Sequence, residues 1–343
     1  MLTTRLGRTD LMVTRTAFGA LPIQRCSEAD AVAILRRALE AGVNFYDTAR
    51  AYSDSEAKIG KAFSPAERQA IVISTKTFAE TAAELWEHLH TSLKNLNTDY
   101  VDIYQFHNPA SVPMPGGAGG LYEAALEAKK QGKIRFIGIT NHRIEIAKQA
   151  VASGLFDTLQ YPFSLLSGPL EFELAEMCRE SDTGFIAMKA LSGGLLTNAA
   201  AAFAFMRQYE HVVPIWGIQR MSELEQFIAL EADPPELDAA MLAQIEKECG
   251  ALQGDFCRGC GYCLPCPAGI EINMAARIYY FITRSPYKNF ITPEYQAHMA
   301  KVEDCINCGA CKSRCPYGLD TPELLKRQYE LYKGFVREHD GEI

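Results

Sequence analysis

Apolar and polar positions follow a repeating order over roughly the first 230 residues of the chain. Short apolar, β-branched runs are each followed by a stretch with helical periodicity, for example 28–41, 81–96, 121–131 and 144–152. This alternation predicts a series of strand–helix units. The expected strands are 15–18, 44–47, 70–75, 100–106, 135–139, 158–161, 184–188 and 212–216.

Eight strands that alternate with helices predict an α/β fold, a closed (β/α)8 TIM barrel with parallel strands. A doubly wound open sheet is the main alternative. That fold usually has a glycine-rich turn after its first strand, whereas residues 18–22 read Phe-Gly-Ala-Leu-Pro. Before the first strand, segments 3–6 and 11–13 flank a Gly-Arg-Thr-Asp turn, which predicts a hairpin that closes the barrel floor.

The pattern changes near residue 250, where the chain becomes rich in Cys, Tyr and Pro. Helical periodicity returns over 272–283 and 322–332, and Thr321 ahead of Pro322 is expected to be a helix N-cap. We therefore expect two domains. The barrel is assigned residues 1–250, and a small, mainly helical domain is assigned residues 251–343.

Composition and charge narrow the classes of function. The chain has 343 residues, 48% of them hydrophobic, which suits one large core and a small second domain. Its 34 Lys and Arg against 42 Asp and Glu give a net charge of −8, which disfavours nucleic acid as a partner. No apolar run has the length of a membrane helix, and the first residues do not resemble a secretory signal. We expect a cytoplasmic protein without a membrane partner.

Eight of the eleven cysteines lie between Cys257 and Cys315, and such clustering in a large chain indicates metal rather than disulfides. The second motif, from Cys305 to Pro316, has the bacterial ferredoxin spacing C-x2-C-x2-C-x3-C-P. The first, from Cys257 to Pro267, is one residue shorter before its last cysteine. Zinc is the alternative, but zinc sites usually have separated cysteine pairs. We therefore expect two 4Fe–4S clusters.

In two-cluster ferredoxins the fourth cysteine of each motif binds the other cluster. Gly259, Gly261 and Gly309 supply the backbone freedom that a tight loop around a cluster needs. The expected ligands are Cys257, Cys260, Cys263 and Cys315 for one cluster, and Cys266, Cys305, Cys308 and Cys311 for the other.

Polar residues also stand at the carboxyl ends of three consecutive expected strands. Asp47 and Tyr52 follow the second strand, Lys76 follows the third, and His107 follows the fourth. Each alone has an ordinary interpretation, as a helix cap, a core residue, a surface charge or a hydrogen-bonded polar group. Because these strand ends converge on one face of a barrel, we expect the four side chains to meet in one pocket.

These segments resemble the aldo-keto reductase family, whose members use an Asp, Tyr, Lys and His tetrad. The resemblance covers residues 1 to about 230 and includes Arg5-Leu-Gly-Arg-Thr and Gly138-Ile-Thr-Asn. The whole chain is similar to a subgroup of these proteins with a C-terminal 4Fe–4S ferredoxin-like domain.

The resemblance implies hydride transfer between a nicotinamide and a carbonyl carbon, with Tyr52 as the proton donor. Free Tyr has a pKa near ~10, and Lys76 would lower it while Asp47 holds Lys76 in place. His107 would orient the carbonyl oxygen by a hydrogen bond.

The resemblance also implies cofactor contacts. Thr140, Asn141 and Gln160 would hold the nicotinamide carboxamide, and the segment from Gly217 to Arg220 would lie near the phosphates. Arg220 favours NADP over NAD if it contacts a 2′-phosphate, but a solvated surface position is an equal alternative.

Two departures from the family pattern concern the cofactor. Met188 takes the position where many members place a Tyr against the nicotinamide, and methionine packs less rigidly. The eighth strand also lacks the basic cluster that is typical of strong NADP binders.

Three hypotheses of function remain open. Nicotinamides transfer two electrons as hydride, whereas iron–sulfur clusters pass one at a time, so direct exchange needs a carrier such as a flavin. The first hypothesis is an NAD(P)-dependent carbonyl reductase or alcohol dehydrogenase with structural or regulatory clusters. The second is an electron-transfer oxidoreductase that links the barrel to a ferredoxin or flavin partner, and the third is a non-enzymatic redox sensor. Residues 108–120 carry no charge, which favours a small neutral carbonyl or alcohol substrate.

Overall fold

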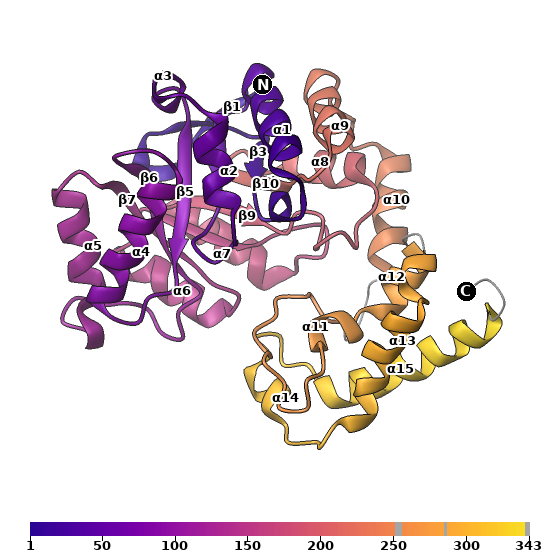
Figure 1. Cartoon of the computed structure of the whole chain (residues 1–343). Helices are drawn as coiled ribbons and strands as arrows, with labels where there is room; N and C mark the ends of the chain where they lie inside the picture. The colour runs from indigo at the N-terminus through magenta and orange to yellow at the C-terminus, as the bar shows by residue number, and fades with distance from the viewer. Residues whose placement is uncertain (251–255, 285–286, 340–343) are drawn as a thin grey trace. The chain divides into compact units, whose positions relative to one another are not determined.

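The structure is a computed structural model that describes residues 1–250, 256–284 and 287–339 (Figure 1). Residue contacts divide the chain into two units. One comprises Met1–Leu191 and Asn198–Ile245, and the other comprises Ser192–Thr197 and Glu246–Ile343. The expected domain limit at residue 250 stays a prediction. Within the described ranges, the helices fall short of the length and hydrophobicity that crossing a membrane requires.

The first unit contains a closed barrel of parallel strands. Its last strand pairs with its first, Ile215 with Ala17 and Gly217 with Gly19, so the sheet closes on itself. This confirms the predicted barrel and rules out the open sheet. Each strand begins and ends within two residues of its expected position. The strands are β3 (Ala17–Gly19), β4 (Phe45–Asp47), β5 (Val72–Thr77), β6 (Val101–His107), β7 (Ile134–Thr140), β8 (Thr158–Pro162), β9 (Gly184–Met188) and β10 (Val212–Gly217).

Helices connect successive strands, and local capping sets where several of them begin. Ser27 Oγ accepts the Asp30 N–H ahead of α1, and Thr81 with Glu84 forms a capping box at α4. The helices are α1 (Glu28–Glu40), α2 (Ser55–Ala62), α3 (Pro65–Arg68), α4 (Ala82–Asn95), α5 (Leu121–Lys130), α6 (Ile144–Ser153), α7 (Pro169–Glu180), α8 (Ala199–Arg207), α9 (Met221–Ala232) and α10 (Ala239–Gly250), with 3-10 turns η2 (Pro22–Arg25) and η3 (Ala118–Gly120).

The predicted N-terminal hairpin is present. Strands β1 (Thr3–Arg5) and β2 (Met12–Thr14) pair antiparallel around the turn η1 (Gly7–Thr9). Leu6 between them is fully buried in the barrel core. It lies against Gly184, the first residue of β9, where an added Cβ would come within 2.8 Å of the Leu6 side chain. The hairpin therefore closes the barrel at the amino ends of its strands.

The second unit is helical, as expected, with two corrections. The expected helix over 272–283 is interrupted at Arg277, whose backbone N–H bonds to the Met274 carbonyl three residues back, so the α-helical i−4 pattern stops there. Thr321 is the first residue of its helix rather than the N-cap, and Asp320 holds the cap position. The elements are α11 (Ile272–Ala275), α12 (Ile278–Arg284), η4 (Tyr287–Phe290), α13 (Pro293–Ala300), η5 (Lys301–Asp304), α14 (Ala310–Arg314) and α15 (Thr321–Glu338).

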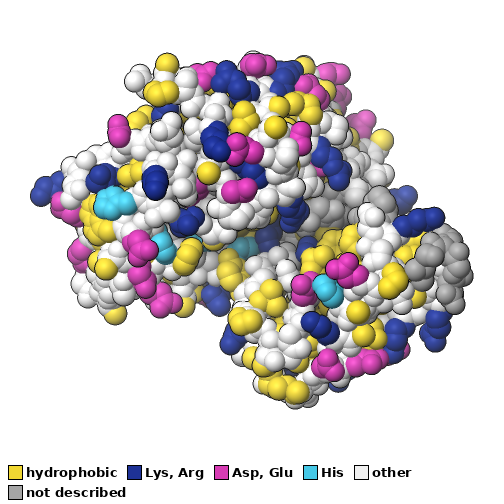
Figure 2. Space-filling view, in the orientation of Figure 1, with side chains coloured by type: hydrophobic (Ala, Val, Ile, Leu, Met, Phe, Trp, Pro, Cys, Tyr) yellow, Lys and Arg dark blue, Asp and Glu magenta, His cyan; other side chains and the backbone are white. Residues whose placement is uncertain are grey.

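The surface carries charges of both signs. On the face shown in Figure 2, Lys and Arg side chains are interspersed with Asp and Glu, with single hydrophobic side chains between them. Such a mixture is typical of a solvated protein surface.

Candidate active site and cysteine-lined cavities

The centre of the barrel site is an ion pair between neighbouring strands. Asp47 ends β4, and the register pairs it with Ser74 of β5, two residues before Lys76. Lys76 Nζ donates to Asp47 Oδ2 at 2.6 Å and to the Thr48 carbonyl at 2.6 Å. The Asp47 side chain is 2% exposed and the Lys76 side chain is 1% exposed. The expected surface-charge alternative for Lys76 is therefore wrong in this structure.

Burial dominates the electrostatics of this pair. It raises the pKa of Asp47 and lowers the pKa of Lys76, while their mutual attraction opposes both changes. Removing one member of such a buried pair typically costs about 3–5 kcal/mol, because the other charge is left without compensation. The pair therefore fixes the position of the Lys76 ammonium.

Tyr52 and His107 lie beside this ammonium. Lys76 Nζ is 5.2 Å from the centre of the Tyr52 ring. The Tyr52 and His107 rings are 5.9 Å apart, centre to centre, and meet edge to face at 85°. The structure thus brings the four expected catalytic residues together at the carboxyl ends of β4, β5 and β6.

His107 is held in its neutral form. Burial, assisted by the charge of Lys76, lowers its pKa to about 3. A neutral imidazole at physiological pH can donate one hydrogen bond without adding a charge to the site.

Gln105 is a residue of this site to which sequence reasoning gave no role. Its Nε2 donates to Ser74 Oγ at 2.7 Å and to Gln160 Oε1 at 2.8 Å, and it lies 3.3 Å from Asp47 Oδ1. An added Cβ at Gly138 would come within 2.8 Å of Gln105, so the glycine leaves room for this side chain. The signal available in the sequence is its place two residues before His107, on the same face of β6.

The expected carboxamide contacts lie on the next strands. Thr140 is paired in register with both His107 and Gln160, which places the three in one row across β6, β7 and β8. Thr140 Oγ1 accepts the Asn108 N–H at 3.0 Å, and Asn141 Nδ2 donates to the Pro109 carbonyl at 3.0 Å. All three expected contacts are buried, and each has hydrogen-bond partners within the protein.

The other expected cofactor contacts are more exposed. Met188 ends β9 and packs partly against the barrel core, and Gly217 ends β10 with its backbone exposed. The Arg220 side chain is 72% exposed and lies 3.7 Å from Glu223. Met188 and Gly217 are thus at carboxyl ends of strands, whereas Arg220 is the N-cap residue of α9.

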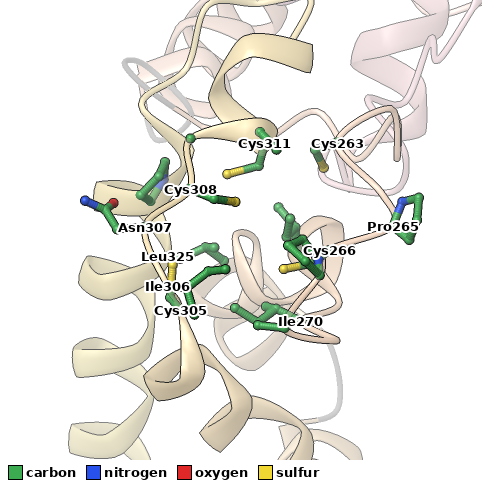
Figure 3. A pocket seen from close by; sticks show the side chains of 16 residues that line it. Cys263, Pro265, Cys266, Ile270, Cys305, Ile306, Asn307, Cys308, Cys311 and Leu325 are labelled. Carbon is green, nitrogen blue, oxygen red and sulfur yellow. The ribbon is translucent and has the colours of Figure 1, made fainter.

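Two cavities in the second unit are lined by cysteines. The lining of one includes Cys257, Cys260, Cys263 and Cys315. The lining of the other includes Cys266, Cys305, Cys308 and Cys311, together with Cys263. Figure 3 shows Cys266 and Cys308 pointing into the same space from opposite sides. Each cavity thus contains the four cysteines expected together, including the fourth cysteine of the other motif.

The protonation of the thiols and their spacing bear on what the cavities can hold. Burial raises the pKa of Cys257 and raises that of Cys263 to about 12, so a bare thiolate is disfavoured there. In the part of the chain that the structure describes, no three His, Cys, Asp or Glu side chains are grouped as ligands of a single metal ion. Ligands of a four-iron cluster surround a wider group, and four thiols around each cavity fit one.

Comparison with known families separates the same two parts. A family model described as the aldo/keto reductase family matches residues 16–212, more than half of the chain. A second, described as a 4Fe-4S dicluster domain, matches residues 256–320.

Curated relatives match the barrel. The aldo-keto reductase YhdN of Bacillus subtilis is 32% identical over 185 residues, 50% of this chain and 55% of the relative. Methylglyoxal reductase DkgB of Salmonella typhi is 40% identical over 148 residues, 41% and 53% of the two chains. L-galactose dehydrogenase of Arabidopsis thaliana is 30% identical over 211 residues, 56% and 66% of the two. The matches thus span about half to two thirds of these relatives.

A solved structure shares the fold. The aldo-keto reductase AKR11C1 from Bacillus halodurans, in its holo form, matches with a TM-score of 0.63 and 23% sequence identity. The match covers 72% of this chain and 96% of the AKR11C1 chain. The prediction of an oxidoreductase enzyme of this type is confirmed by the family match. The chain belongs to the aldo/keto reductase family and carries, in addition, a C-terminal 4Fe-4S dicluster domain.

Proposed function

We propose that the barrel catalyses hydride transfer between NADP, or NAD, and a small neutral carbonyl or alcohol. The observation that carries this proposal is the buried Lys76–Asp47 ion pair beside the rings of Tyr52 and His107. A bound nicotinamide supplies the hydride, and the protein supplies the proton and the orientation.

Each residue of the tetrad has one task in this reaction. Tyr52 donates its proton to the carbonyl oxygen as negative charge develops there. Lys76 stabilises the resulting tyrosinate, because its positive charge is held close to the ring. Asp47 compensates the buried ammonium and fixes its position. His107, neutral because of its lowered pKa, donates a hydrogen bond to the same oxygen.

Residues further along the barrel would hold the nucleotide. Thr140, Asn141 and Gln160 offer one hydroxyl and two amides, a set of donors and acceptors that fits a carboxamide. Met188 would pack against the nicotinamide ring. Gly217 and Arg220, at the end of β10, would lie near the phosphates, and the guanidinium would favour NADP.

The loop after β6 and the names of two relatives support the proposed substrate class. Residues 108–120, between β6 and α5, contain no charged side chain to hold a phosphate or carboxylate. Relatives named for methylglyoxal and L-galactose support a small uncharged carbonyl or alcohol.

The replacement of Tyr52 by Phe tests the proposal. We expect kcat/KM for NADPH-dependent aldehyde reduction to fall about 10²–10⁴-fold, because proton transfer is lost, while the Kd for NADPH stays within twofold. The matched control is Tyr46→Phe on β4. The Tyr46 hydroxyl donates to the Val43 carbonyl, so its removal should leave kcat/KM unchanged. Wild-type protein that turns over neither NADPH nor NADH with aldehydes, ketones and alcohols would contradict the proposal.

A second function is favoured by the cavities. Cys263 lines both of them, so two clusters held there would be neighbours, and Cys308 of the second motif is exposed. This arrangement supports two 4Fe–4S clusters that exchange single electrons with a ferredoxin or flavin partner at the surface. On this proposal residues 251–343 form the electron-transfer domain and residues 1–250 the reductase domain.

A further inference from the structure

Arg277 is a buried cation in the second unit. It is 8% exposed and lies at the break between α11 and α12. Its Nε donates to the Asn273 carbonyl at 2.8 Å, and its guanidinium lies 4.9 Å from the centre of the Phe281 ring. These contacts hold the charged end of the side chain in a fixed place.

That place is against the first cysteine motif. A Cβ added to Gly259 would come within 2.5 Å of the Arg277 guanidinium carbon, so the glycine backbone and the guanidinium are in direct contact. Gly259 lies between Cys257 and Cys260, has a φ of +64°, and donates its N–H to Cys257 Sγ at 3.4 Å.

Cations near the second motif are in a different environment. The Lys312 side chain is 55% exposed and forms an ion pair with Asp320 at 2.6 Å. Arg314 is exposed and donates to the Pro265 carbonyl. Solvent screens such exposed charges, whereas a buried guanidinium acts at low dielectric.

We propose that Arg277 raises the reduction potential of the cluster held by Cys257, Cys260, Cys263 and Cys315. The proposal rests on the presence of the two clusters. Uptake of one electron adds one negative charge to a cluster and breaks no bond to the protein. A fixed positive charge beside it stabilises the reduced form relative to the oxidised form, and charge near a cluster is one of the factors that set its potential.

The test is an anaerobic redox titration of the full-length protein with dithionite, followed by electron paramagnetic resonance. In Arg277→Gln we expect one of the two midpoint potentials to fall by 59 mV or more, a tenfold change in the equilibrium of a one-electron couple. Arg277→Met, which keeps an apolar stem near Phe281, should give the same shift. Arg277→Lys keeps the charge and should retain most of the wild-type potential.

Lys312→Gln is the matched control, and its effect on the midpoint potentials should be much smaller because that charge is exposed to solvent. A salt titration of the wild type needs no variant: the couple beside Arg277 should change little between low and high ionic strength, since a buried charge is weakly screened. Equal salt dependence of both couples would contradict the proposal.

Iron and sulfide analysis separates the failures. Gln and Met variants that keep both clusters and both potentials would overturn the role of Arg277. A Lys variant that shifts as far as the Gln variant would show that packing, not charge, matters. Wild-type protein without cluster iron would instead overturn the proposed clusters.

Discussion

His107 shows how one residue's environment changes its acid–base behaviour. Its pKa is lowered to about 3 by burial and by Lys76. Between pH 6.5 and 3 the unfolded chain therefore binds a proton that the folded chain does not. The free energy of unfolding should fall as pH falls through this window, by at most about 1.4 kcal/mol per pH unit, and by less because the side chain is partly exposed.

Substitution of this histidine gives the measurement. In His107→Asn, we expect the free energy of unfolding, from urea titrations at several pH values, to decline less steeply between pH 6.5 and 3 than in the wild type. His298→Asn on an exposed face of α13 is the control and should leave the slope unchanged. Identical slopes in His107→Asn and the wild type would contradict a His107 that stays neutral in the folded protein.

Residue types and spacing were enough to predict that Asp47, Tyr52, Lys76 and His107 lie close together, because barrel topology brings consecutive strand ends together. Their catalytic roles stay a prediction. Gln105 and Arg277 could not be assigned in that way. Gln105 acquires its role from Ser74 and Gln160, and Arg277 from Gly259, which are partners from other elements. Neither side chain belongs to a spacing motif, so only the folded structure reveals these contacts.

At the scale of elements, the N-terminal hairpin has a structural task that is separable from catalysis. Leu6 is fully buried in the barrel core at the amino ends of the strands. Leu6→Ala should lower the free energy of unfolding by about 2–5 kcal/mol, because it removes buried methyl groups and leaves a cavity. Below the unfolding transition, kcat should stay as in the wild type, since the tetrad lies at the opposite strand ends.

Met12→Ala provides the comparison within the same hairpin. The Met12 side chain is 54% exposed, so the variant's free energy of unfolding should differ from that of the wild type by no more than about 0.5 kcal/mol. Urea unfolding and steady-state kinetics on the two variants check both expectations. A loss of kcat in Leu6→Ala without a loss of stability would show that the hairpin reaches the active site.

Elements with strong periodicity were predicted best. Strands β3–β10 follow directly from short apolar runs between helices. The break between α11 and α12 was missed because it is a local change of backbone hydrogen bonding at Arg277, and hydrophobic periodicity does not record such a change.

At the scale of the whole molecule, the two proposed functions differ in how far activity depends on the clusters. If hydride transfer is confined to the barrel, Cys308→Ser should lose cluster iron while NADPH-dependent turnover stays within twofold. Cys308 is the exposed cysteine of the second motif, so its loss disturbs the core little. Iron and sulfide content and turnover are measured on the same anaerobic sample.

Cys249→Ser, on α10 and outside both motifs, is the control and should change neither iron content nor turnover. A fall in turnover that parallels the loss of iron in Cys308→Ser would favour the electron-transfer function instead.

The segment Ser192–Thr197 has a consequence for how such a protein can be assembled. It lies between β9 and α8 in the chain, yet it is grouped with the second unit, and Leu195 and Leu196 within it are buried. The chain therefore passes between the units after Leu191, after Thr197 and after Ile245. When each domain is one continuous segment of the chain, a single cut between the domains separates them completely. Here, a fragment that begins after Ile245 would leave out Ser192–Thr197, so it would lack a segment that the residue contacts assign to the same unit.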